Sequence, residues 1–183
     1  MSPRRLPLLI AGAIILADQL TKWWVVSALQ VGETRSLIPG VLYLHRVENS
    51  GAAFGLLPGW GSFIALGAMA AVVVILLVVR RLPGRLEALA MGLVLGGAVG
   101  NLADRVFRGP GWLDGKVVDF LRFDFFPSFP AFNVADSAIT VGAVLALLAA
   151  FVLARDEGAA SRLTVKSSAS GRMGPTVTSS PPR

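Results

Sequence analysis

Four long apolar segments constrain this chain more than any other feature of its sequence. A helix needs roughly 20 mostly apolar residues to cross the hydrocarbon core of a bilayer, which is about 30 Å thick. Four segments meet that requirement: residues 8–29, 62–79, 86–103 and 132–153. Of the 183 residues, 54% are hydrophobic and only 15% are charged, well below the charged share of a typical soluble domain. The sequence therefore predicts an all-α membrane protein with four transmembrane helices.

The distribution of arginines predicts how these spans are oriented. Six arginines lie next to the ends of the expected spans that share one side of the membrane: Arg4, Arg5, Arg80, Arg81, Arg85 and Arg155. Because basic residues concentrate in cytoplasmic loops, we expect both termini in the cytoplasm and the loops 30–61 and 104–131 outside. The formal net charge of +6 is thus a topology signal. The sequence has no basic stripe with interleaved aromatic residues, so nothing in it indicates a nucleic-acid partner.

The first span could instead be a cleaved signal peptide, since Arg4 and Arg5 precede its apolar run. However, the run is long, it contains Asp18 and Lys22, and no convincing small-x-small cleavage site follows it. We expect it to be retained as a transmembrane helix.

Two segments outside the spans have a character of their own. Residues 41–47 lie between turn-forming residues and predict a strand, part of a small sheet on the outer membrane surface. Residues 155–183 are rich in Ser, Thr, Gly and Pro and predict a disordered cytoplasmic tail, because they bury too little apolar surface to fold. The expected organisation is a transmembrane domain, residues 1–154, followed by this tail.

The candidates for chemistry are acids, amides and serines, because cysteine is absent and His45 is the one histidine. This excludes disulfides, thiolate metal sites, a cysteine nucleophile and zinc held by several imidazoles. Charge at membrane depth is costly and by default indicates a functional site. Asp18 and Lys22 lie four residues apart on one helix face. They form either a structural ion pair or a charge pair that supports a site.

Small residues occur next to amides at two places. Asn49 and Gly51 lie in a run of small residues before the second span, and Gly97 and Asn101 end the third span, just before Asp104 and Arg105. Such glycines indicate either close packing of helices or room for the extended backbone of a substrate.

Two further acids stand near the same membrane face. Asp119 is bracketed by apolar residues, and Asp136 lies in the first turn of the fourth span. Asp136 alone is explained by capping of the helix and by the helix dipole. Two converging carboxylates, however, would share a proton and could perform general acid–base chemistry. Spacing does not prove convergence, and Asp18 and Asp104 remain alternative members of such a pair.

Taken together, these motifs resemble the lipoprotein signal peptidases, also called signal peptidase II. The resemblance rests on five blocks that occur in the order of the family: residues 18–22 (DQLTK), 48–55 (ENSGAAFG), 96–105 (GGAVGNLADR), 117–120 (VVDF) and 132–137 (FNVADS). Each block alone is weakly specific, whereas five in order on four spans are highly specific. The tail after Arg155 lies outside the resemblance.

The resemblance implies an intramembrane aspartyl endopeptidase of the bacterial cell membrane. Its substrates would be prolipoproteins with a diacylglyceryl-modified cysteine, cut just before that cysteine near the outer face, with no metal or cofactor. Asp119 and Asp136 match the catalytic aspartates. The remaining matched residues line, support or orient the site: Asn49, Gly51, Asn101, Arg105, Asn133, Asp18, Lys22 and Asp104. A small outer sheet forming a cradle and inhibition by globomycin-type antibiotics are also implied, and we expect a monomer.

Three other interpretations remain open on the sequence alone. A small transporter or channel would place its acids along a path through the bundle. A non-enzymatic scaffold would use them only for folding. A serine–lysine hydrolase would combine Ser50 or Ser137 with Lys22, although no motif supports it.

Overall fold

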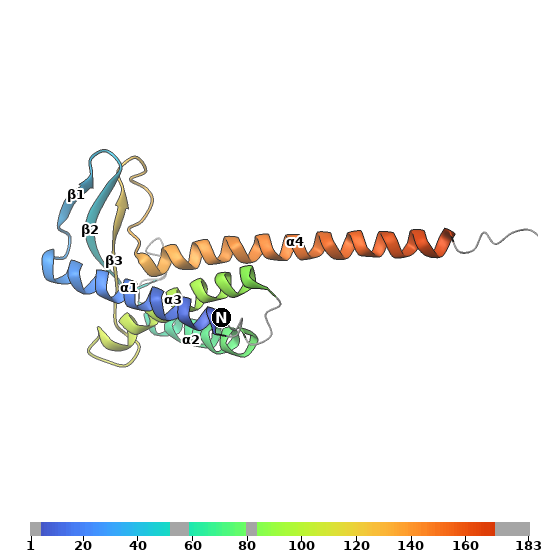
Figure 1. The fold of residues 1–183 in the computed structure, drawn as a ribbon. Helices are drawn as coiled ribbons and strands as arrows, with labels where there is room; N and C mark the ends of the chain where they lie inside the picture. Colours follow the sequence, from blue (N-terminus) through green and yellow to red (C-terminus); the bar gives the residue numbers. More distant parts are fainter. Residues whose placement is uncertain (1–4, 52–58, 80–83, 171–183) are drawn as a thin grey trace, which may run out of the picture. The chain divides into compact units, whose positions relative to one another are not determined.

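The computed structural model describes residues 5–51, 59–79 and 84–170, with side chains to residue 155. Within these ranges the chain forms four helices and three strands (Figure 1). The helices are α1 (Leu6–Ala28), α2 (Gly61–Val78), α3 (Arg85–Phe107) and α4 (Val134–Ser170). Each is long and apolar enough to cross a membrane, with the crossing part of α4 ending at Arg155. The predicted class, four membrane-crossing helices with a small sheet, is confirmed.

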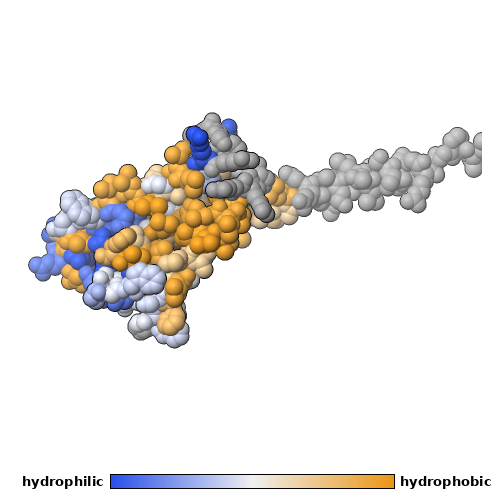
Figure 2. Space-filling model, turned by 90° about the horizontal axis from the view of Figure 1, so that it is seen from below, coloured by the Kyte–Doolittle hydropathy of each residue, from blue (hydrophilic) through white to orange (hydrophobic). Residues whose placement is uncertain are grey.

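The surface of the helices is apolar where a soluble protein would be polar. On α2, for example, Phe63 and Leu77 are 66% and 69% exposed. Figure 2 shows apolar side chains gathered over the helices, with polar ones more frequent toward the end that carries the sheet. Exposed apolar patches of this extent indicate contact with lipid. The chain is therefore a multi-pass membrane protein.

Glycines allow α1 and α3 to pack closely. A Cβ added at Gly96 of α3 would lie 2.7 Å from the Cβ of Ile14 on α1, and one at Gly92 would lie 2.8 Å from the carbonyl oxygen of Pro7. Real Cβ atoms do not approach so closely, so these positions require glycine. Close approach of this kind is how helices pack in membranes.

Three antiparallel strands form the sheet at one end of the helices (Figure 1). Their order is β1 (Thr34–Ile38), β2 (Leu42–Asn49) and β3 (Val117–Phe123). The turn between β1 and β2 contains Gly40 at φ 75°, a left-handed conformation that favours glycine. The predicted strand 41–47 is confirmed as β2. The sequence analysis did not predict β1 or β3 as strands.

A small apolar core fixes the sheet to α1. Leu44 of β2 and Val118 and Phe120 of β3 pack against Val25 and Leu29, at the end of α1. The opposite face of β3 is therefore available for polar side chains. The site described below lies on that face.

Residues up to 146 form one compact part, and α4 from Leu147 onward is described by itself. In this second part the described side chains are mostly exposed, and Arg155 lies 5.9 Å from the centroid of the Phe151 ring. The helix runs to Ser170, beyond the predicted end of the fourth span at residue 153. The proposed division into residues 1–154 and a tail 155–183 stays a prediction.

Candidate active site

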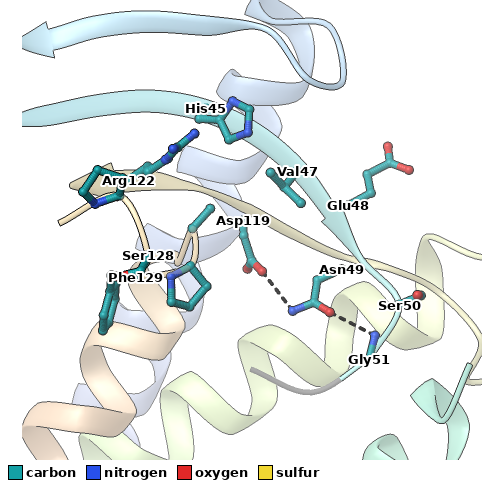
Figure 3. Close-up of a pocket in the computed structure, with 13 residues that line it drawn as sticks. His45, Val47, Glu48, Asn49, Ser50, Gly51, Asp119, Arg122, Ser128 and Phe129 are labelled. Atoms are coloured by element: carbon teal, nitrogen blue, oxygen red, sulfur yellow. Dashed lines mark hydrogen bonds between the residues drawn. The ribbon is translucent and has the colours of Figure 1, made fainter. Parts of the chain in front are cut away.

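Asp119 is a buried acid held by two amides. It lies on β3 opposite Val47 of β2, and 4% of its surface is exposed. Its Oδ1 accepts a hydrogen bond from Nδ2 of Asn133 at 2.7 Å, and its Oδ2 accepts one from Nδ2 of Asn49 at 3.1 Å. The bond from Asn49 is drawn in Figure 3, which also shows Asn49 accepting from the backbone N–H of Gly51. Both carboxylate oxygens are thus oriented by side chains that the sequence singled out.

Asp136 occupies the first turn of α4 and takes part in a reciprocal cap. Its backbone N–H donates to Oδ1 of Asn133 at 2.9 Å, and its Oδ2 accepts from the backbone N–H of Asn133 at 3.1 Å. This is the geometry of a capping box. Its other oxygen, Oδ1, accepts from Nδ2 of Asn101 at 2.8 Å. The capping interpretation of Asp136 is therefore correct, but it does not account for the contact with Asn101.

Asn133 connects the two acids. Its side chain donates to Asp119 while its backbone donates to Asp136, and none of its surface is exposed. Both acids also line the same cavity of about 630 Å³. The structure thus brings together Asp119 and Asp136, as the two-carboxylate hypothesis requires.

The surroundings of Asp119 alter its protonation. Burial raises the pKa of Asp119 from 3.8 to about 7, and the negative charge of Asp136 contributes to this rise. The hydrogen bonds from Asn49 and Asn133 oppose the rise without cancelling it. Near neutral pH, Asp119 therefore exchanges a proton, which is the property that acid–base catalysis needs.

Asp18 and Asp104 hold the backbone next to this acid pair. Oδ1 of Asp18 accepts from the N–H of Ala135 at 2.9 Å, and Oδ2 of Asp104 accepts from the N–H of Val118 at 3.1 Å. Ala135 and Val118 directly precede Asp136 and Asp119. The two alternative acids thus lie behind the central pair, in positions that fix where its backbone runs.

Lys22 joins these two supporting acids. Its Nζ lies 2.9 Å from a carboxylate oxygen of Asp18 and 2.9 Å from one of Asp104, and it donates to Oδ1 of Asn101 at 2.9 Å. The side chains of all three charged residues are fully buried. Lys22 is paired with two carboxylates, and Ser137 donates its hydroxyl to the carbonyl of Asn133, so these contacts give no support to a pair of Ser137 with Lys22.

Arg105 and the glycines complete the site. Nη2 of Arg105 donates to the carbonyl of Gly51 at 2.6 Å, which fixes the backbone where β2 ends. Gly51 lines the cavity, as expected. Gly97 does not leave room for a substrate: a Cβ there would collide with the carbonyl oxygen of Ala135, so α4 fills that space. The expectation of open space around Gly97 is therefore wrong.

Comparison with known proteins assigns this architecture to a family. A family model described as signal peptidase (SPase) II matches residues 10–152. The chain belongs to the signal peptidase II family. The lipoprotein signal peptidase of Shouchella clausii is 42% identical over 156 residues, which cover 84% of this chain and 98% of that protein. The lipoprotein signal peptidase of Mycobacterium leprae is 43% identical over 147 residues, covering 79% and 72%.

Two solved structures share the fold of this signal peptidase. One, a bacterial membrane enzyme determined in meso at 2.3 Å, has a TM-score of 0.72 and 30% identity, covering 79% of this chain and 87% of that one. A second, at 1.9 Å, has a TM-score of 0.68 and 32% identity, covering 78% and 90%. The family and the fold agree with the expectation from the five sequence blocks, and they make the chain a membrane peptidase.

Two residues near the site of this family member were not singled out in the sequence. Nε2 of Gln19 donates to the carbonyl of Gly100 at 3.0 Å and to Oδ1 of Asp104 at 3.2 Å, linking α1 to α3. Its place beside Asp18 is a signal that could have indicated it. Arg122 lines a second cavity together with Asp119. Side chains alternate between the two faces of a regular strand, so the sequence predicts Asp119 and Arg122 on opposite faces. For this reason Arg122 could not be recognised from the sequence as a neighbour of Asp119.

Proposed function

We propose that this membrane peptidase is an aspartyl endopeptidase that removes signal peptides from prolipoproteins, cutting just before a diacylglyceryl-modified cysteine. The observation that carries the proposal is the junction at Asn133, where one buried amide holds both Asp119 and Asp136 at a common cavity. Membership of the signal peptidase II family and the names of its relatives, lipoprotein signal peptidases, support the substrate class.

The reaction follows from two carboxylates that share one proton. Asp136 carries the charge, because it lies at the positive N-terminal end of α4, where a helix stabilises an anion. It takes a proton from water, and the water oxygen attacks the scissile carbonyl carbon. Asp119 donates its proton to the carbonyl oxygen as the tetrahedral intermediate forms. On collapse, the C–N bond breaks, the amine nitrogen takes the proton held by Asp136, and one hydroxyl of the intermediate returns its proton to Asp119 as the new carboxyl group forms.

The larger cavity suits an apolar substrate segment. Besides the two acids, it is lined by aliphatic side chains from three helices: Ile64, Ala68, Leu102, Ile139 and Val141. Such a lining accepts the apolar part of a signal peptide, while the bilayer accommodates the two acyl chains. Asn49, Gly51, Asn101, Arg105 and Asn133 support the acids or present polar groups at this cavity. No metal or cofactor takes part in these steps.

We further propose that the chain crosses the bacterial cell membrane with both termini in the cytoplasm, and that the site lies near the outer face. The positions of the arginines support this orientation. So do four exposed tryptophans near the ends of α1, α2 and α3 that are closest to the sheet: Trp23, Trp24, Trp60 and Trp112. Tryptophan concentrates at membrane–water interfaces. We expect the protein to be a monomer that acts on prolipoproteins in the bilayer. We also expect globomycin-type peptides to inhibit it, and we expect no nucleic-acid partner.

Cleavage of a purified substrate tests this function. The protein in detergent is incubated with a diacylglyceryl-modified prolipoprotein, and release of the signal peptide is followed on a gel. Asp119→Asn and Asp136→Asn should each lower the rate at least about a hundredfold, the usual contribution of acid–base groups. Asp114→Asn is a matched control, because Asp114 is an exposed acid that accepts only a local turn hydrogen bond among the bonds described.

The rival functions predict other results. A well-folded Asp119→Asn or Asp136→Asn variant that cuts at the wild-type rate would remove that residue from the mechanism. Loss of cleavage in Ser50→Ala or Ser137→Ala, with both aspartate variants active, would favour the serine–lysine alternative. A wild-type protein that cuts no lipidated prolipoprotein would leave a scaffold or a transporter.

A further inference from the structure

A second cavity lies on the sheet side of Asp119. It has a volume of about 430 Å³ and contains residues of β2, β3 and the segment that precedes α4 (Figure 3). Polar groups form a larger share of its lining than in the cavity between the helices, and its polar side chains include His45, Glu48, Asn49, Ser50, Arg122 and Ser128. Asp119 lines both cavities. A peptide bound across Asp119 would therefore have one side in a largely apolar environment and the other side in a more polar one.

This asymmetry assigns a direction to the substrate, given the proposed function on which the inference rests. A signal peptide is apolar, whereas the chain released after the cleaved bond is a water-exposed polypeptide. The aliphatic cavity suits the first, and the polar cavity suits the residues that follow the lipidated cysteine. The charges of the polar cavity can then determine which of those residues are preferred.

A bulge in β3 brings Arg122 into this cavity. The backbone N–H groups of Phe120 and Leu121 both donate to the carbonyl of Phe132, at 3.0 and 2.8 Å. Two residues of β3 thus stand opposite one, which shifts the alternation of side chains along the strand. As a result Arg122, three residues after Asp119, lies on the same side as Asp119. Figure 3 shows its side chain extending toward His45.

The charge of Arg122 is not balanced by a carboxylate in the described part of the chain. No ion pair of Arg122 is found there. Glu48, which also lines the cavity, is already paired with Arg46 at 3.0 Å and Lys116 at 3.7 Å. Burial lowers the pKa of His45, and the charge of Arg122 lowers it further, so His45 is neutral at neutral pH. The polar cavity therefore presents a partly buried guanidinium that is free to bind an anion.

We propose that Arg122 is a specificity-determining residue that binds an acidic side chain in the substrate, a few residues after the lipidated cysteine. An extended peptide advances about 3.3 Å per residue, so three residues of β3 and three of the substrate cover the same distance of about 10 Å. The preferred acid thus lies about three residues beyond the cleaved bond. Guanidinium groups suit this role because they bind carboxylates with two parallel hydrogen bonds.

Paired substrates test the proposal. Two lipidated prolipoprotein peptides are compared, one with aspartate and one with lysine at residues 2–4 after the lipidated cysteine. In neutral detergent, the wild-type kcat/KM should be at least about fivefold higher for the acidic peptide, the effect of one partly exposed ion pair. The difference should appear mainly in KM, since Arg122 contacts the substrate away from the cleaved bond. Arg122→Glu should reverse the preference.

Arg35→Glu is the matched control, because Arg35 is an exposed arginine on β1 that does not line the cavity. It should keep the wild-type ratio. Equal rates on the two peptides with the wild-type protein would overturn the inference while leaving the proposed function intact. Failure to cut either peptide would overturn the proposed function and the inference with it. Stimulation by added anionic phospholipid that disappears in Arg122→Glu, with no preference between peptides, would assign Arg122 to a lipid headgroup and also overturn the inference.

Discussion

Replacing Lys22 with methionine should destabilise the protein strongly. The ammonium of Lys22 lies 2.9 Å from Asp18 and 2.9 Å from Asp104, and all three side chains are fully buried. Methionine keeps most of the apolar volume but removes the charge, so two carboxylates remain buried without a cation. Removing one partner of a buried ion pair costs about 3–5 kcal/mol. For a chain of this size that corresponds to a fall in Tm of about 6 to 20 °C.

The design of the experiment separates charge from packing. Thermal unfolding in detergent is followed by tryptophan fluorescence for Lys22→Met and for the triple variant Asp18→Asn/Lys22→Met/Asp104→Asn. The triple variant has no uncompensated charge, and its amide oxygens can still accept from the N–H groups of Ala135 and Val118. It should therefore regain at least half of the lost Tm.

Lys116→Met serves as the control for loss of a lysine. Lys116 is 54% exposed and lies 3.7 Å from Glu48, so its removal should change stability by less than about 1 kcal/mol. The reasoning is refuted if Lys22→Met unfolds within about 2 °C of wild type, or if the triple variant is less stable than Lys22→Met alone.

Three further predictions concern protonation, packing and the tail. Because the pKa of Asp119 is raised from 3.8 to about 7 on folding, the free energy of unfolding should fall as pH rises through this window and level off above it. Thermal scans from pH 4 to 8 should show this fall, and Asp119→Asn should lack it. Gly97→Ala should lower Tm and cleavage, since its Cβ would collide with Ala135, whereas Gly67→Ala on α2, which meets no atom within 4 Å, should behave as wild type. Truncation after Glu157 should leave cleavage unchanged in the gel assay, and loss of cleavage with intact insertion would show that the tail is needed.

The membrane-crossing helices were predictable because length and apolarity suffice to identify them. The third helix extends to Phe107, beyond the predicted end at residue 103. The reason is that Asp104 and Arg105 are buried in polar contacts, so a helix end that looks like an interfacial loop in the sequence is part of the packed site. Hydropathy alone does not predict that buried charges are stabilised by polar partners, because those partners are distant in sequence.

The sheet was harder to predict because its strands lack a local pattern. All five residues of β1 are exposed, so no alternation of apolar and polar residues marks them. In β3 the buried residues are consecutive, and their pairing with β2 spans about seventy residues of sequence. The acids of the site were predictable as candidates from their apolar neighbours. Their division into a central pair and two supporting residues depends on which backbone N–H each carboxylate accepts, and only the structure shows that.

The position of Asn133 has a consequence for biosynthesis. Its side chain orients Asp119 on β3, and its backbone begins the helix that carries Asp136. As the chain is made from its N-terminus, this residue and α4 emerge after every other element of the site. A nascent chain that lacks them has one aspartate without a partner and a cavity without one wall. Under the proposed mechanism, proteolytic competence arises only with the last helix, so an incompletely synthesised chain would not cut other proteins in the membrane.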